Sequence, residues 1–77
     1  MQLLIVSPEK TLYKGEAVSV TVPGTKGMFE ILDNHAPIIS SLQSGTLICK
    51  DEHTTTFEIL GGFVEVANNE VSICVEI

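Results

Sequence analysis

The chain has 77 residues, and this length predicts one domain spanning residues 1–77, because so short a chain cannot divide its apolar residues between two cores. Four lysines, no arginine and ten carboxylates give it a formal net charge of −6. Binding of nucleic acid or insertion among anionic lipids would require clustered cations, so neither nucleic acid nor lipid is expected as a partner.

No apolar run of the sequence approaches the ~20 residues that a membrane-spanning helix needs. The first residues also lack the basic segment of a signal peptide, which makes the cytoplasm the expected compartment. Cys49 and Cys74 stand in apolar, strand-like runs, so we expect two buried, reduced thiols rather than a disulfide. Two isolated cysteines fall short of a structural zinc site, and no metal is expected.

The apolar residues recur with a period of two in short runs, and this pattern predicts strands without a helix. Residues 3–6 form a continuous apolar run, which predicts a strand buried on both faces. Pro8 ends this strand because a proline cannot donate a hydrogen bond to a sheet. Residues 11–13 predict a second, short strand that residues 14–15 close.

The clearest alternation of the sequence covers residues 17–22. Its three valines are expected on one face of a strand: Val18, Val20 and Val22. Pro23-Gly24 is typical of a type II turn, in which Gly24 would supply the positive φ. Gly27 closes this loop, which we expect to protrude before a further strand at residues 28–32.

Residues 33–37 predict a second rigid loop, because Pro37 biases the residue before it towards an extended conformation. Three further strands are predicted after this loop, at residues 38–42, 46–50 and 55–60. The acidic segment between the last two of these strands is interpreted as a solvated hairpin tip.

Gly61-Gly62 is interpreted as a bulge or a close approach of two backbones. A strand at residues 63–67 carries Val64 and Val66 on one face. Asn68-Asn69 predicts a tight hairpin turn, since asparagine tolerates the left-handed region. The apolar residues then alternate to the end of the chain. The predicted fold class is all-β, a flattened sandwich or barrel of about 8–10 short strands.

Neither histidine has the sequence context of a catalytic base. His53 stands at the acidic hairpin tip and is interpreted as an exposed turn residue. His35 precedes Ala36-Pro37, and no glycine-framed nucleophile accompanies the serines that follow it. A loop-structuring or interface role is therefore favoured for His35.

The remaining candidates for chemistry also favour structural interpretations. The glutamates of the predicted strands are assigned to the solvent-exposed faces of those strands: Glu30, Glu58, Glu65 and Glu70. Residues 24–27 lack the spacing of a phosphate-binding loop, and a predicted strand follows them where such a loop needs a helix. We therefore expect no enzyme, no catalytic residue and no cofactor.

Several short motifs follow one another along the chain in a specific order. They are Ile5-Val6-Ser7-Pro8-Glu9, Thr21-Val22-Pro23-Gly24-x-x-Gly27-x-Phe29, Asn34-His35-Ala36-Pro37 and Gly61-Gly62-Phe63-x-Glu65-Val66, with Asn69 after them. In this order and spacing the chain closely resembles the N-terminal β-sandwich domain of the ATP synthase epsilon subunit, whose mitochondrial counterpart is called delta. The resemblance covers essentially the whole chain.

The resemblance implies a non-catalytic place in the central stalk, or rotor, of an F-type ATP synthase, peripheral on the cytoplasmic face of the bacterial inner membrane. There the domain would link the gamma subunit to the membrane c-ring and so couple proton translocation to ATP synthesis. By position, the c-ring interface would be Thr25, Lys26, Gly27 and Met28. The gamma interface would be Ser7, His35, Ile39, Ser40 and Leu42. The structural turns would be Pro23, Gly24, Pro37, Gly61 and Gly62.

Many members of this family continue into a C-terminal helical hairpin that inhibits ATP hydrolysis and in some binds ATP. The sequence stops at Ile77, so neither such a hairpin nor nucleotide binding by it is expected here. The alternative function is that of a biotinyl or lipoyl carrier domain, which has a similar length, acidity and all-β character. Carriers present their modified lysine between characteristic neighbours, and Thr25 and Gly27 around Lys26 do not match that pattern.

Overall fold

The computed structural model describes residues 1–77 as nine strands joined by short connections. The strands are β1 (Gln2–Val6), β2 (Thr11–Glu16), β3 (Ser19–Gly24), β4 (Gly27–Leu32), β5 (Ile38–Leu42), β6 (Gly45–Lys50), β7 (Thr54–Ile59), β8 (Gly61–Ala67) and β9 (Glu70–Glu76). The structure has no helix with the length and apolar character needed to cross a membrane.

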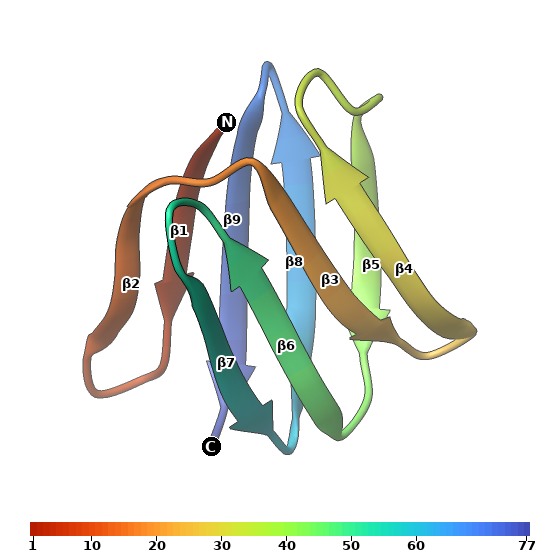
Figure 1. Cartoon of the computed structure of the whole chain (residues 1–77). Helices are drawn as coiled ribbons and strands as arrows, with labels where there is room; N and C mark the ends of the chain where they lie inside the picture. Colours follow the sequence, from red (N-terminus) through yellow and green to blue (C-terminus); the bar gives the residue numbers. More distant parts are fainter.

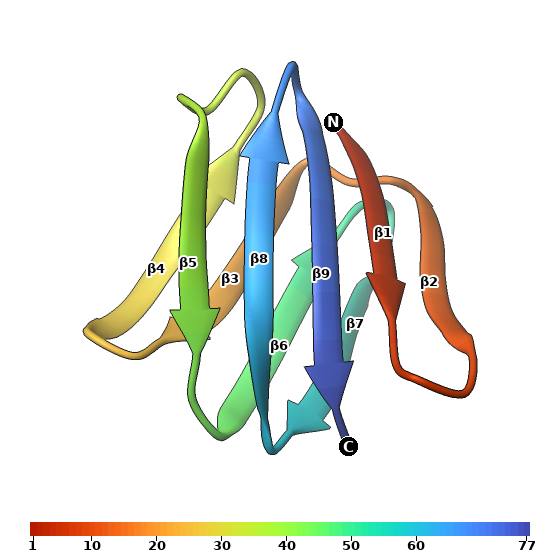
Figure 2. The same cartoon turned by 180° about the vertical axis from the view of Figure 1, so that it is seen from behind.

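All nine strands belong to one hydrogen-bonded sheet that folds over into two layers (Figure 1). The back layer has the order β2-β1-β9-β8-β5, and the front layer has the order β4-β3-β6-β7. The layers join at one corner, where β3 and β5 share the single pair Gly24–Leu42. Figure 2 shows the back layer from outside, with β9 between β8 and β1. The predicted all-β sandwich is therefore confirmed.

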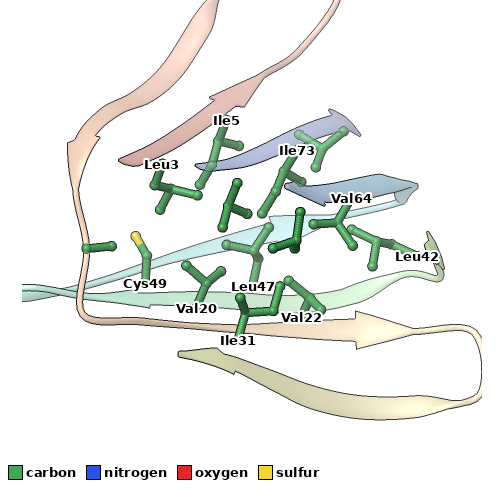
Figure 3. Packing of buried hydrophobic residues seen from close by; sticks show 14 of the residues in the cluster. Leu3, Ile5, Val20, Val22, Ile31, Leu42, Leu47, Cys49, Val64 and Ile73 are labelled. Atoms are coloured by element: carbon green, nitrogen blue, oxygen red, sulfur yellow. The ribbon is translucent and has the colours of Figure 1, made fainter. Parts of the chain in front are cut away.

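The core lies between the two layers and consists of side chains that alternate along each strand (Figure 3). Sixteen buried hydrophobic residues form one cluster, to which both layers contribute. Ile5 and Ile73 come from the back layer, and Val20, Ile31 and Leu47 come from the front layer. A one-residue slip of any strand would turn its apolar side chains to solvent, so burial fixes the register of both layers.

Two expectations about the first half of the chain are wrong. Leu3 and Ile5 are buried, but Leu4 between them is 36% exposed, because no element covers the outer face of the back layer. Val18 is 55% exposed. It lies in the link that carries the chain from the back layer to the front layer, before β3 begins, so it does not share the inward face of Val20.

The predicted turn at Pro23-Gly24 is also wrong. Both residues are buried in β3. Gly24 and Gly27 are register partners, so the hairpin turns at the two residues between them. The positive φ belongs to Gly27, at 127°. Gly24 is needed for a close approach instead, since a Cβ atom there would lie 2.8 Å from the Gly27 carbonyl oxygen.

Two predictions about the second half of the chain are confirmed. Asn68 and Asn69 have φ values of 53° and 59°, as a tight hairpin between β8 and β9 requires. Gly62 marks a close backbone approach, because a Cβ atom there would lie 2.1 Å from the Cys74 carbonyl oxygen.

Both cysteine thiols are free, as expected, but only Cys49 is buried. Cys74 is half-buried on the outer face of the back layer, contrary to expectation.

Candidate interaction surfaces

The turn between β3 and β4 projects from one side of the molecule (Figure 1). We call residues 25–28 the hairpin tip; all four are exposed. The Thr25 N–H donates to the Ser41 carbonyl at 3.2 Å, and the two hydroxyls of these residues are 3.1 Å apart. These contacts fasten the tip to β5. The ammonium of Lys26 forms no ion pair, because both ion pairs of the chain involve the Met1 amine.

A hollow of about 430 Å³ lies between the hairpin tip and β5, and we call it the corner hollow. Its lining residues are Gly24, Thr25, Lys26, Gly27, Met28, Phe29, Ile38, Ile39, Ser40 and Ser41. The hollow therefore brings together residues that the resemblance assigns to two different partners. The predicted c-ring contacts form one wall, and two of the predicted gamma contacts, Ile39 and Ser40, form the other.

An apolar stripe crosses the outside of the back layer, and we call it the outer apolar face. Its residues are Leu4, Val6, Ile39, Phe63 and Cys74. Phe63 is the register partner of Cys74, and Cys74 is the partner of Val6. Ile39 lies diagonally from Phe63, since Ile39 pairs with Glu65 and Ser41 pairs with Phe63. Ile39 is 74% exposed and Phe63 is 51% exposed, so the stripe is open to solvent.

A second hollow, of about 300 Å³, lies at the end of the outer apolar face beside the β1–β2 connection. Val6, Phe63 and Cys74 are among its apolar lining residues, and Ser7 also lines it. The surrounding charge is negative on balance, because three exposed carboxylates of β8 and β9 lie on this face, Glu65, Glu70 and Glu76, against one lysine, Lys14, beside Leu4. The surface is thus an apolar stripe with an acidic border.

The loop between β4 and β5, residues 33–37, lies at the end of the molecule where the N-terminus and the β8–β9 turn also lie (Figure 1). His35 is half-buried, and its Nδ1 atom is 2.7 Å from the Ala36 carbonyl oxygen. A carbonyl only accepts hydrogen bonds, so Nδ1 is the donor, and in the neutral ring Nε2 is then an acceptor. The ring has no nucleophile or carboxylate partner, and the geometry gives it no catalytic arrangement.

The α-amino group of Met1 reaches the start of this loop. It donates to Asp33 Oδ1 at 2.5 Å, to the Ala17 carbonyl at 3.0 Å and to Glu16 Oε2 at 3.4 Å. The hydrogen bond to Asp33 is the main cause that raises the pKa of the amine above its ordinary value of 8.0. The charged amine thus joins the β4–β5 loop to the end of β2 and the link that follows it.

The remaining predicted site residues differ widely in burial. Leu42 is 5% exposed and belongs to the core, so its side chain cannot reach a partner in this conformation. The Ser40 hydroxyl donates to the Ser41 carbonyl at 3.2 Å. Pro37 is exposed directly before β5, and Gly61 begins β8 after a bend at Leu60. No three His, Cys, Asp or Glu side chains are grouped so that they could hold a metal ion.

Comparison with known proteins identifies the family. A family model described as the ATP synthase delta/epsilon chain β-sandwich domain matches residues 1–77, which is the whole chain. The chain belongs to this family. The biotinyl and lipoyl carriers are a different family, so the alternative function is set aside.

Individual relatives from the epsilon family agree with the family model. The chain is 49% identical over 74 residues to the ATP synthase epsilon chain of Leptospira borgpetersenii, covering 95% of this chain and 58% of that protein. It is 42% identical to the epsilon chain of Chlorobaculum tepidum, covering 94% of this chain and 84% of that protein. The chain therefore spans little more than half the length of its Leptospira relatives.

Two solved ATP synthases contain chains with the same fold. In the mitochondrial enzyme of Euglena gracilis, solved with its c-ring, the similar chain has a TM-score of 0.88 and 23% identity, covering 95% of this chain and 48% of that one. In the central stalk and c-ring of the Tetrahymena thermophila enzyme, the values are 0.84 and 19%, covering 99% and 63%. At these identities the likeness shows a shared fold.

Sequence reasoning missed the central residues of the outer apolar face, Phe63, Val6 and Cys74. A signal for Phe63 was present: Val64 and Val66 were expected on one face, so Phe63 had to lie on the opposite, wet face. An exposed aromatic in such a position marks a contact surface more often than chance. Val6 and Cys74 gave no such signal, because only the pairing of β1 with β9 brings them beside Phe63.

Proposed function

We propose that residues 1–77 act as one non-catalytic domain of the rotor of an F-type ATP synthase. The domain links the gamma subunit to the membrane c-ring, and so couples proton translocation to ATP synthesis. It would sit peripherally, on the cytoplasmic face of a bacterial inner membrane. Membership of the delta/epsilon family and the likeness to epsilon chains support this role.

The observation that carries the proposal is that one rigid body presents two unpartnered surfaces that meet at a corner. The hairpin tip projects beside β5, and the outer apolar face begins at Ile39 on the same strand. A domain that only bound one partner would need one such surface. Two adjoining surfaces suit a body that holds two neighbouring subunits together.

The hairpin tip is the proposed c-ring contact. Lys26 is free to pair with a carboxylate or a carbonyl on the loops of the c-ring. A pair at the rim of an interface contributes only ~0–1 kcal/mol, so the shape of the turn should matter more than this charge. That shape depends on Gly27, whose φ of 127° disfavours other residues.

The outer apolar face is the proposed gamma contact. Two of the gamma residues that the resemblance implies, Ser7 and Ile39, border or belong to it. Its acidic border fits a partner whose apolar strip is flanked by lysine and arginine. His35 would extend this contact at the far end of the layer, with Nε2 accepting a hydrogen bond from the partner.

Transmission of torque needs a body that resists shear. Forty-seven backbone hydrogen bonds hold the strands of the folded sheet together, and one cluster of sixteen buried side chains joins its two layers into such a body. Close-packed interiors have low compressibility, so a force applied at the tip reaches the outer face without much deformation. No reactive group takes part in this role.

Site-specific cross-linking in the assembled rotor tests the proposal. A photoreactive group at Lys26 should attach to the c-ring, and one at Ile39 should attach to gamma. The same group at Thr56, which is exposed on the front layer, is the control and should attach to neither. Co-purification of the chain with gamma and the c-ring should accompany these products; lack of affinity for both components would refute the function.

A further inference from the structure

The 33–37 loop has contacts of two kinds. Within and beside the loop, the His35 N–H donates to the Leu32 carbonyl at 3.1 Å, and His35 Nδ1 donates to the Ala36 carbonyl at 2.7 Å. These bonds shape the loop, but they do not fasten it to the rest of the fold. Asn34 also has a φ of 62°, so the loop includes a left-handed residue.

The Met1 amine holds Asp33 at the start of the loop, and one side chain from another turn attaches the residue that follows. The Asn34 N–H donates to Asn69 Oδ1 at 2.7 Å, although the two residues are 35 positions apart in the sequence. Asn69 belongs to the β8–β9 turn, and its own carbonyl accepts a hydrogen bond from the Gln2 N–H at 3.2 Å. Asn69 therefore joins the loop, the β8–β9 turn and β1.

The hairpin turn alone does not require this side chain. Asn68 and Asn69 both adopt left-handed φ values, which glycine and aspartate also tolerate. The side chain of Asn68 is exposed and forms no hydrogen bond, whereas that of Asn69 accepts from the loop. The acceptor at position 69 thus has a role separate from the geometry of its turn.

We propose that Asn69 is a positioning residue: its side-chain oxygen holds the 33–37 loop so that His35 presents Nε2 to a hydrogen-bond donor on the partner subunit. The presentation of His35 to a partner rests on the proposed contact with gamma. The attachment of the loop by Asn69 does not rest on it, because that attachment is a property of the free chain.

Two matched variants separate the acceptor from the turn. Asn69→Gly keeps the left-handed φ and removes the acceptor, while Asn68→Gly makes the same change at the neighbouring residue without removing a contact. Asn69→Asp restores an acceptor at the same place. Unfolding midpoints of the variants report any shared effect on the turn.

Amide hydrogen exchange of Asn34 in the free chain is the first measurement. Asn69→Gly should speed this exchange by about 2- to 10-fold, the range expected when one net hydrogen bond is lost, and Asn68→Gly should leave it unchanged. Asn69→Asp should restore the slower rate. Equal exchange in the two glycine variants would overturn the proposal.

Affinity for the gamma subunit is the second measurement. Asn69→Gly should weaken binding by a similar factor relative to Asn68→Gly, at equal unfolding midpoints. Equal affinity of the two variants would overturn the role in presenting His35. If the unaltered chain itself failed to bind gamma, the proposed function would fail, and the exchange result alone would decide whether Asn69 holds the loop.

Discussion

At the scale of single residues, close backbone contacts constrain this fold more tightly than side-chain chemistry does. Gly62 shows this most clearly, because a Cβ atom there would lie 2.1 Å from the Cys74 carbonyl oxygen and its φ is 149°. At neighbouring Gly61 the nearest atom would lie 3.5 Å away, which is an ordinary contact. Two adjacent glycines therefore face very different constraints.

Alanine substitution at these two positions should separate the constraints. Gly62→Ala should lower the free energy of unfolding by about 2–5 kcal/mol, because it adds both a clash and backbone strain. Gly61→Ala should cost less than about 1 kcal/mol. Urea denaturation of both variants checks this, and equal losses would show that the close approach at Gly62 can relax.

The Met1 amine should make stability depend on pH in the alkaline range. Its pKa is raised in the folded chain, chiefly by the hydrogen bond to Asp33, so its contribution is complete below the ordinary value of 8.0 and is lost as the pH rises through the folded-state value. Burial also raises the pKa of Cys49, so its preferential ionisation in the unfolded chain lowers stability in the same range.

Comparison with Asp33→Asn isolates the amine from the thiol. The free energy of unfolding, measured by denaturation from pH 7 to 10, should decline in both chains, and the decline should be smaller in the variant. Parallel curves would contradict a role for the amine–Asp33 contact.

At the scale of elements, alternation of apolar residues identified most strands, because each strand has one face towards the core. It failed where burial depends on contacts distant in sequence. Residues 3–6 gave no sign that Leu4 would remain uncovered, and Val18 continued the period of two although the chain was changing layers. The turn at Pro23-Gly24 was misplaced because Gly24 serves close packing, which composition alone does not distinguish from a turn.

The candidate surfaces were predictable to a smaller extent. Position within the family motif located the hairpin tip, and the structure shows that all four of its residues are exposed. The same reasoning included Leu42, whose side chain is in the core. Membership of a motif does not state which face of a strand a residue occupies, and only the pairing of strands decides that.

The hairpin tip gives a prediction at this scale. Gly27→Val should reduce assembly with the c-ring more than Lys26→Ala does, because a β-branched residue is strained at a φ of 127° while an exposed ion pair contributes little. A pull-down of both variants with rotor components provides the measurement. Equal recovery of the two would contradict the primacy of turn shape.

At the scale of the whole molecule, the chain is small and its stability margin is narrow. A chain of this length buries only ~60–65% of its unfolded surface, so its core alone provides a limited free energy of unfolding. The outer apolar face adds exposed Ile39 and Phe63. Covering this face with a partner should therefore stabilise the fold as well as the assembly.

Thermal unfolding in the presence of gamma measures this effect. A partner at about 100 times its Kd adds about 2.7 kcal/mol, which should raise the unfolding midpoint of so small a domain by about 10 °C or more. Phe63→Ser should remove much of the increase, while Leu32→Ser, which alters an exposed apolar residue on the front layer, should retain it. A midpoint that gamma leaves unchanged would contradict binding at this face.

The parallel pairing of β1 with β9 has a consequence for biosynthesis. Gln2 is the register partner of Glu70 and Val6 of Cys74, so the first strand is held by the last one. A nascent chain can form the β1–β2 hairpin early, but Leu3 and Ile5 stay without their main apolar neighbours until β9 has left the ribosome. Such long-range closure slows folding and leaves the apolar side chains of the first strand exposed until it is complete. We therefore expect chaperones to bind this chain mainly as ribosome-bound intermediates.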